Sequence, residues 1–476
     1  MSVPAPQAAA LGAALPGSTD AANSRAAMML TGPVFATLCR MALPNLLMMS
    51  AQAAANLLES YFVGLLGVAE LAGVALVYPL IMLMQMLSAG AIGGGISSAI
   101  ARALGAGRRD EAESVAQHAV VLALGLGALS TAALLAGGRA LFAAMGGHGA
   151  ALEAALAYSD VVFAGAAFLW LLNGLASVLR GTGNMALPAG VVTAGVPILL
   201  VVSPVLIFGF GPLPALGIRG AALALVVYYV VGSAVLLVAL LRGRSGLRLA
   251  LGARLAARRF RDILVVGGPA AINSTMTNVG VAVATAFVSG LGIHVLAGFG
   301  IGIRLEYLLT PVVFGIGAAM IPMIGMNVGA GNVRRAREVA WVGALTGGGV
   351  AGTIGLAASI FAPQWIGLFT DDAAAIVGGA AYLRLVGPAY ALLGFGLALS
   401  FASQGARRMR WAVIGGIGRA ATIGGVAALA QALAGPGIRN VAIAMVVALL
   451  VYAVCNAIPW LRDGSTARPA RHSATR

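Results

Sequence analysis

Long apolar runs account for most of this 476-residue chain, and glycine, proline or arginine bounds each of them. A helix needs about 20 apolar residues to cross a bilayer. Hydrophobic residues make up 60% of the chain and charged residues only 9%, whereas a soluble domain carries roughly 25% charged residues. We therefore predict an all-α polytopic membrane protein with twelve transmembrane helices, at about 40–66, 71–100, 114–137, 153–179, 186–210, 219–241, 262–290, 295–325, 338–362, 375–404, 410–434 and 439–461.

The distribution of basic residues predicts the orientation of the chain. All 29 basic residues are arginines, and the formal net charge is +15. Arginines crowd the loops after the even-numbered spans, whereas the alternate loops hold only Arg139, Arg219 and Arg439. Because positively charged loops stay in the cytoplasm, both termini are expected there, in a bacterial inner membrane. The positive charge of the loops therefore sets the orientation of the spans in the lipid bilayer, and nucleic acid is not an expected partner.

The chain also repeats itself at an offset of 225 residues. Pro44 corresponds to Pro269, and the Leu-Ala-Gly triplet at 71–73 corresponds to the same triplet at 296–298. Six spans in each unit give both halves one orientation, with a symmetry axis along the membrane normal. Two six-helix lobes that face each other across a cavity can rock between two openings. The absence of a phosphate-binding loop motif then favours a secondary transporter over an ATP-driven one or an enzyme.

These patterns predict five segments. The basic segment before the second half carries interleaved Leu247, Leu251, Leu255 and Phe260, which predicts a linker helix on the inner leaflet. The predicted segments are a disordered N-terminal tail at 1–33, an N-lobe at 34–241, the basic cytoplasmic linker at 242–261, a C-lobe at 262–461 and a C-terminal tail at 462–476.

The first span carries a line of polar residues that includes an acid. Asn45, Gln52, Asn56 and Glu59 are separated by seven, four and three residues, so they share one face of a helix. Pro44 below them should loosen the helix. An acid in hydrocarbon is tolerated mainly where it faces the bundle interior or a wet cavity, and desolvation disfavours its charged form. Glu59, Asn56 and Gln52 are therefore predicted to form the ion-coupling site, with Glu59 as a proton switch; the alternative is a hydrogen-bonded cluster that holds helices together.

Other polar and sulfur-containing side chains at membrane depth are candidates for the cavity wall. Uncharged groups of this kind either line a cavity or hold helices together. Flexible methionines such as Met49 suit a site for apolar compounds of varied shape, although they also serve as core filler. The candidate cavity or substrate residues are Asn45, Met49, Gln85, Asn173, Ser203, Asn273, Thr277, Glu306 and Gln404.

Several long motifs resemble one transporter family. They are RMALPNLLMMSAQAAANLLESYFVGLLGVAELAGVALVYP, SSAIARALGAGRRDEA, SPVLIFGFGPLPALGIRGAALA and LRLVGPAYALLGFGLALSFASQGARRM. Over about residues 30 to 460 the chain resembles the multidrug and toxic compound extrusion family, in particular its DinF-like bacterial branch. The resemblance implies an exporter that exchanges protons or sodium for cationic or amphipathic compounds. The acid of the family's first-span motif, usually aspartate, falls on Glu59, and the preceding asparagine falls on Asn56.

The chain also departs from the family pattern at several positions. Ser203 stands where the family often has an aspartate, Leu199 where it has an asparagine, and Leu225 where it has a hydroxyl. A second family site, an acid in the seventh span, falls on Thr277. Since sodium needs several oxygen ligands, these substitutions favour H⁺ over Na⁺ as the coupling ion, with no metal and no cofactor.

A flippase and an intramembrane enzyme are the alternatives to proton-coupled export. A flippase for lipid-linked precursors needs several cationic groups for a pyrophosphate, and within the spans only Arg304, Arg384 and Arg419 are available. An intramembrane enzyme needs a clustered nucleophile, base or metal set, and the four histidines lack ligand spacing. The expected partners are thus small-molecule substrates and the bilayer, with no obligate protein partner evident.

Overall fold

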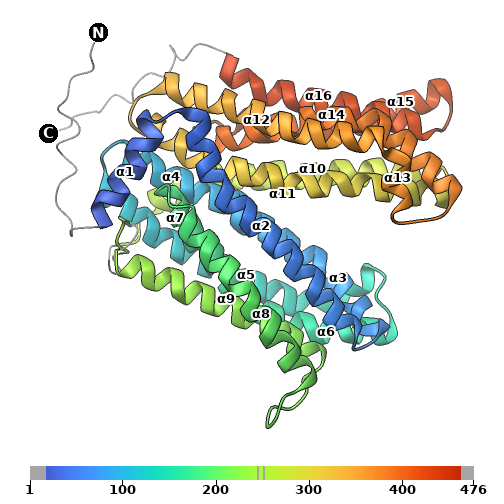
Figure 1. Ribbon diagram of the computed structural model, residues 1–476, viewed down its shortest axis with the longest axis horizontal. Helices are drawn as coiled ribbons and strands as arrows, with labels where there is room; N and C mark the ends of the chain where they lie inside the picture. Colours follow the sequence, from blue (N-terminus) through green and yellow to red (C-terminus); the bar gives the residue numbers. More distant parts are fainter. Residues whose placement is uncertain (1–17, 244–245, 250–251, 253, 462–476) are drawn as a thin grey trace.

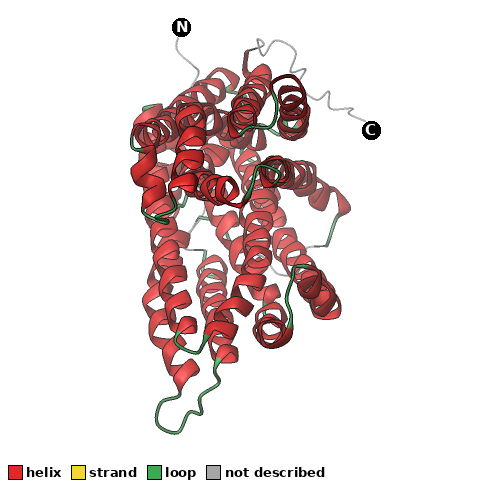
Figure 2. Cartoon of the chain, turned by 90° about the vertical axis from the view of Figure 1, so that its right-hand side faces the viewer, coloured by secondary structure: helices red, strands yellow, loops and turns green. Residues whose placement is uncertain are grey.

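The computed structural model describes residues 18–243, 246–249, 252 and 254–461, and these residues form helices joined by loops (Figures 1 and 2). In chain order the helices are α1 (Ser18–Thr31), α2 (Val34–Gly64), α3 (Val68–Gln85), the π-helical η2 (Met86–Ile92), α4 (Gly93–Gly105), α5 (Arg109–Ala144), α6 (Gly149–Ala164), α7 (Ala166–Gly181), α8 (Ala186–Phe208), α9 (Ile218–Leu241), α10 (Ala257–Ser289), α11 (Ile293–Gly329), α12 (Val333–Ile360), α13 (Ala362–Gly367), α14 (Ala373–Gly405), α15 (Arg410–Ala434) and α16 (Ile438–Leu461).

The helices confirm the predicted membrane-spanning class. Eleven are long and apolar enough to cross a bilayer, and α6 and α7 together form a twelfth span that bends by 48°. The span predicted at 153–179 is thus two helices with Gly165 between them. Helix α2 continues through Pro44 from Val34 to Gly64. Several spans extend beyond their predicted limits, because hydropathy marks the apolar centre of a helix and not its polar ends.

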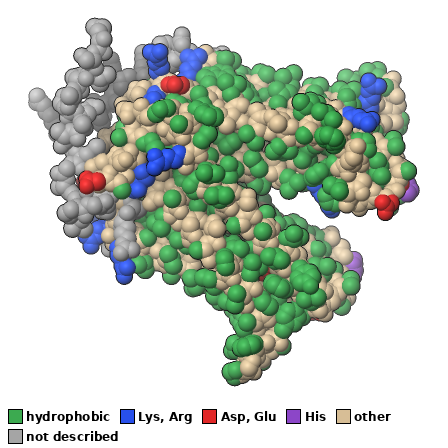
Figure 3. Space-filling view, viewed as in Figure 1, with side chains coloured by type: hydrophobic (Ala, Val, Ile, Leu, Met, Phe, Trp, Pro, Cys, Tyr) green, Lys and Arg blue, Asp and Glu red, His purple; other side chains and the backbone are tan. Residues whose placement is uncertain are grey.

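The spans form two bundles arranged as a V. Helices α2 to α9 form one bundle and α10 to α16 the other, and the two diverge toward the end remote from the chain termini (Figure 1). The two largest groups of buried apolar residues mostly follow this division. The exceptions are residues 29–42 and Met185, which join the group of the second bundle, and Ile263, which joins that of the first. A hollow separates the bundles at the open end, and basic side chains gather at the opposite end of this face (Figure 3).

The bundles meet at the terminal end of the molecule. Ser98 Oγ of α4 donates to the Gln404 carbonyl of α14 at 2.5 Å, and Arg102 hydrogen-bonds to the Ser98 hydroxyl. Glycine permits a close crossing here, since a Cβ on Gly105 would overlap the Met326 carbonyl of α11. Arg259 of α10 also forms an ion pair with Glu111 of α5. The closed end of the V is therefore a backbone-to-backbone seam with polar contacts.

We expect Gly105→Ala to force this seam open. The new methyl would meet backbone, which cannot yield as a flexible side chain does, and overpacking costs about 1–3 kcal/mol, or about 5- to 150-fold in an equilibrium. With Cys39 and Cys455 changed to Ser, a thiol introduced by Ser98→Cys should then react faster with a maleimide. The matched control is Gly90→Ala in η2, whose Cβ would make only an ordinary 3.6 Å contact with Phe314. Equal labelling rates in both backgrounds would contradict the expectation.

The predicted disordered tail at 1–33 is wrong for the part that the structure describes. Ser18–Thr31 is the helix α1, and it docks on the seam between the bundles. Asn327 of α11 donates to the Met29 carbonyl at 3.0 Å, and Arg335 of α12 donates to the Met29 and Gly32 carbonyls. Met29 also packs beside Gly183 of the first bundle. These long-range contacts order a segment whose composition alone suggested disorder; residues 1–17 and the tail at 462–476 lie outside the described residues.

The predicted linker helix on the inner leaflet is also wrong. The described residues between Arg242 and Ala256 are non-helical, and α10 begins at Ala257, inside the predicted linker. Leu247 and Leu249 are buried in the core of the first bundle, and the Ala256 amide donates to His118 Nε2 at 2.8 Å. Of the leucines on which the amphipathic-helix prediction rested, Leu247 faces protein, Leu255 is exposed, and Leu251 lies outside the described residues. The described part of the segment therefore does not form the predicted helical apolar face.

Candidate functional site

Glu59 lies near the open end of α2, inside the first bundle. The residue is buried, and its Oε1 atom has no hydrogen-bond partner among the described residues. The rings of Tyr158 on α6 and Tyr229 on α9 lie close enough for their hydroxyls to interact electrostatically with the carboxyl group. No basic side chain in the described part of the chain forms an ion pair with Glu59. A carboxyl group with these neighbours is favoured in its neutral form.

A hydrogen-bonded chain of polar side chains lies near Tyr229, toward the middle of the bundle. It begins at Gln85, at the end of α3, which lines the same cavity as Tyr229. Asn173 of α7 donates to Gln85 Oε1 at 3.4 Å and to Ser88 Oγ at 2.8 Å. Ser88 belongs to η2, and such π-helical turns often occur at functional sites because they redirect side chains.

A narrow internal cavity adjoins this chain of polar groups. It holds about 30 Å³ and lies inside the first bundle, which supplies every wall residue except Phe314 of α11. The wall residues are Met48, Met49, Gln52, Gln85, Ala89, Leu172, Asn173, Ala176, Arg180, Val192, Tyr229 and Phe314. Four of the predicted residues, Gln52, Met49, Gln85 and Asn173, are thus brought together in one cavity.

Arg180 is the only charged residue in this wall. Arg180 directly follows the span predicted at 153–179, which suggests a loop position, but it lies within α7 and is 6% exposed. Its Nε atom has no partner among the described residues. Arg180, Tyr158 and Tyr229 are the site residues that sequence reasoning missed. The tyrosines were detectable as hydroxyls in otherwise apolar spans, whereas nothing in the sequence reveals that Arg180 is buried.

The second bundle holds a separate polar cluster. Arg419 of α15 donates to Glu306 Oε1 of α11 at 2.5 Å, and both side chains are buried. Asn273 of α10 donates to Ser400 Oγ at 3.0 Å and to the Tyr452 hydroxyl at 3.3 Å. The Thr277 hydroxyl donates to the Asn273 carbonyl of its own helix. These contacts lie within the second bundle, so Glu306, Asn273 and Thr277 are placed in its interior and not in the wall of the narrow cavity.

The remaining predicted residues are dispersed. Asn45 is buried and donates to the Met185 sulfur at 3.6 Å. Asn56 is half-buried on α2, and its carbonyl accepts from Ser60. The Ser203 hydroxyl is buried on α8 without a partner in the described region, and Gln404 sits at the seam, where its Oε1 faces Gly94. The polar face of α2 therefore does not form one cluster, because its members contact different helices.

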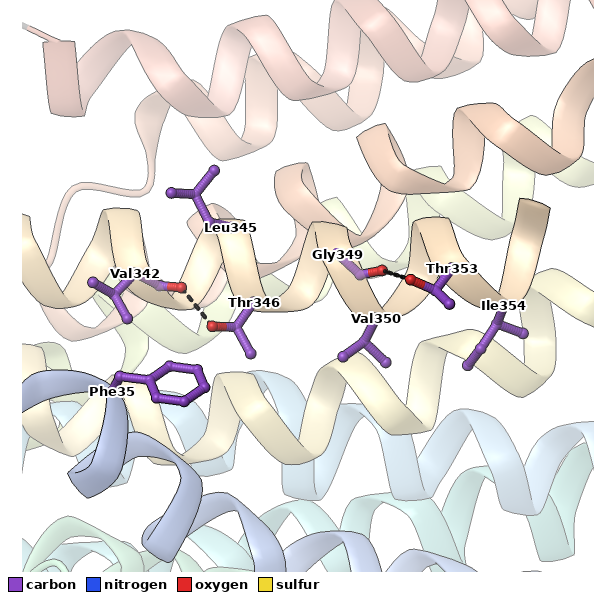
Figure 4. A pocket seen from close by; sticks show the side chains of 8 residues that line it. All are labelled: Phe35, Val342, Leu345, Thr346, Gly349, Val350, Thr353 and Ile354. Carbon is purple, nitrogen blue, oxygen red and sulfur yellow. Dashed lines mark hydrogen bonds between the residues drawn. The ribbon is translucent and has the colours of Figure 1, made fainter. Parts of the chain in front are cut away.

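The outer surface has a shallow apolar groove between α2 and α12. Phe35, Val342, Leu345, Val350 and Ile354 line it (Figure 4). The hydroxyls of the two threonines in the groove donate to carbonyls of α12 itself, at 2.8 Å each. The groove thus presents only apolar contacts, which suits the surrounding lipid and offers no group for ion coupling.

Comparison with known proteins agrees with this architecture. A solved structure described as the outward-facing conformation of a multidrug resistance MATE family transporter of the MOP superfamily superposes with a TM-score of 0.81 at 26% identity, over 91% of this chain and 96% of that one. The FAD transporter of Shewanella oneidensis is 29% identical, over 65% of this chain and 69% of its own length. The probable multidrug resistance protein NorM of Thermotoga maritima is 27% identical, over 78% and 79%.

Two six-helix bundles that diverge from a common seam, each with a buried acid, are the architecture of a membrane transporter. The sequence model of the MatE family matches residues 44–205 and 269–426, and the chain belongs to this family. The two matched segments begin 225 residues apart, which is the offset of the internal repeat. The match confirms the family resemblance, whereas the DinF-like branch stays a prediction.

Proposed function

We propose that this chain is a secondary antiporter that exports amphipathic small molecules across a bacterial cytoplasmic membrane in exchange for protons. The observation that carries the proposal is Glu59, a buried acid with an unpartnered carboxylate oxygen and tyrosines around it. The intramembrane position makes the charged state costly unless water or an ion reaches it. Opening of the cleft to the outside therefore favours exchange of a proton with water, and closure favours the neutral acid.

The orientation of the V completes the proposed cycle. With the arginine-rich end and both termini in the cytoplasm, the hollow in Figure 3 opens to the outside. The seam at Ser98 and Gln404 would then be the cytoplasmic gate. Protonation of Glu59 from outside removes its charge, so the bundles can close around the cavity and separate at the seam. Substrate enters from the inside, and release of the proton there resets the carboxyl group.

Proton coupling is favoured over sodium coupling by the loss of oxygen ligands at positions where the family resemblance implies them. Sodium is held by several oxygen atoms, and Leu199 and Leu225 carry none. In the described residues no group of three or more His, Cys, Asp or Glu side chains converges on one point. A proton needs a single carboxyl group, which the site supplies.

The test is transport into proteoliposomes under one gradient at a time. We expect an imposed pH gradient to drive accumulation of at least one dye from a panel of cationic ethidium, neutral riboflavin and anionic riboflavin 5′-phosphate. A sodium gradient of equal size, with the pH equal on both sides, should give only the background of protein-free liposomes. Accumulation that follows the sodium gradient and ignores the pH gradient would overturn proton coupling.

A flavin dinucleotide is a second candidate cargo. The relative from Shewanella oneidensis is an FAD transporter, and the cavity wall of this chain offers a guanidinium, amides and aromatic rings together. Efflux of FAD from loaded proteoliposomes under the pH gradient tests this cargo directly. Retention of FAD while a dye is transported would exclude it.

A further inference from the structure

The buried arginine in the cavity wall calls for a counter-charge that the protein does not provide. Two arginines are buried among the described residues, Arg180 and Arg419. Arg419 is paired with Glu306, whereas Arg180 forms no hydrogen bond or ion pair within the described part of the chain. A guanidinium cannot lose its charge by deprotonation in a protein, so burial leaves a permanent unpaired cation.

The position of Arg180 directs this cation into the cavity of the first bundle. Side chains on a helix lean toward its N-terminus, and the N-terminus of α7 lies away from the seam. The next residue, Gly181, is held against Ile100 and the Ser97 carbonyl of α4. Arg180 therefore projects from the seam toward the cavity that Asn173 and Phe314 also line.

The remaining cavity wall lacks any acid and is suited to an aromatic, polar ligand. Gln52, Gln85 and Asn173 supply amide groups, and Tyr229 and Phe314 supply ring faces from the two bundles. Met48 and Met49 add adaptable apolar contacts. A guanidinium forms paired, charge-assisted hydrogen bonds with phosphate or carboxylate groups. The wall thus offers one anion-binding group beside a surface for a planar ring.

We propose that Arg180 is the anion-binding residue of the substrate cavity, and that this cavity, which holds about 30 Å³ in the present conformation, widens to take amphipathic compounds that carry a phosphate or carboxylate group. This inference rests on the proposed transport function, and it refines the cationic or amphipathic class expected from sequence. The incoming anion neutralises Arg180, and its apolar or aromatic part contacts Tyr229, Phe314 and the methionines.

The experiment compares two ligands that differ only in a phosphate. The full-length protein is placed in phosphatidylcholine nanodiscs without any ion gradient, and binding of riboflavin and riboflavin 5′-phosphate is measured by flavin fluorescence. The wild type should bind the phosphorylated flavin tighter by about tenfold or more, since hydrogen bonds to charged groups are strong. An equal affinity for the two flavins would overturn the proposal.

Variants assign the preference to Arg180. Arg180→Gln should bind the two flavins equally, and Arg180→Lys, which keeps the charge but not the planar fork, should retain part of the preference. Arg384→Gln removes an exposed charge outside the cavity wall and should keep the full preference. A full preference in Arg180→Gln would overturn the assignment. Should Arg180→Gln fail to fold, the Lys variant and the wild-type comparison still decide.

Two further comparisons are informative. One distinguishes a lipid headgroup from a soluble anion as the ligand, and the other distinguishes failure of the anion-site proposal from failure of proton coupling. In nanodiscs with phosphatidylglycerol, weaker binding of the phosphorylated flavin to the wild type would identify a lipid headgroup as an occupant of the same anion site. Unchanged binding would identify a soluble anion. Because binding is measured without a gradient, a phosphate preference together with gradient-independent transport would refute proton coupling and leave the anion site standing.

Discussion

Glu59→Gln removes the dependence of efflux on the pH gradient. Glutamine keeps the size and a hydrogen-bonding oxygen but cannot exchange a proton, so accumulation against the substrate gradient should fall to the background of protein-free liposomes. Binding of substrate in nanodiscs should persist, because Glu59 does not line the narrow cavity. The measurement is dye accumulation in proteoliposomes at several imposed pH gradients.

Two control variants define what this result means. Glu59→Asp restores a titratable carboxyl group and should retain pH-driven efflux. Glu153→Gln removes an exposed acid that is paired with Arg139 at 2.8 Å, and it should leave transport unchanged. Normal gradient-driven accumulation by Glu59→Gln would show that another group carries the coupling ion.

The second large effect concerns the buried ion pair of the second bundle. Removing one partner of such a pair leaves an uncompensated charge and costs about 3–5 kcal/mol, whereas replacing both partners with apolar residues is often neutral or stabilising. Arg419→Met should therefore strongly lower the thermal stability of the purified protein. The double variant Glu306→Leu with Arg419→Met should recover most of it. The measurement is thermal unfolding in detergent, followed by a fluorescent thiol probe.

This pair also distinguishes a structural role from a transport role. Arg419 lies 6.0 Å from the centre of the Tyr452 ring and links α15 to α11 and α16. A purely structural pair predicts that the double variant transports as the wild type does. If the double variant folds but does not transport, Glu306 or Arg419 has a function beyond stability; if it is no more stable than Arg419→Met, the ion-pair account of stability is wrong.

The membrane-spanning fold was predictable because its signals are local. Each span is an apolar run bounded by glycine, proline or arginine, and the 225-residue repeat is visible as matching motifs in the two halves. Glu59 was predictable for the same reason, since an acid in a long apolar run is conspicuous and its burial costs energy. Gln52, Met49, Gln85 and Asn173 were predicted as site residues, and the structure brings them into one cavity wall.

Contacts between distant segments decided the rest. The ion pair of Glu306 with Arg419 joins residues 113 apart, and no pattern along the chain selects that arginine over Arg304, two residues from Glu306. Composition suggested a disordered tail, yet Asn327 and Arg335 hold α1 through its backbone carbonyls. Arg180 looked like one more loop arginine until the packing of α7 against α4 buried it. Hydropathy reports the preference of a segment for lipid or water, whereas burial and pairing depend on which other segment folds against it.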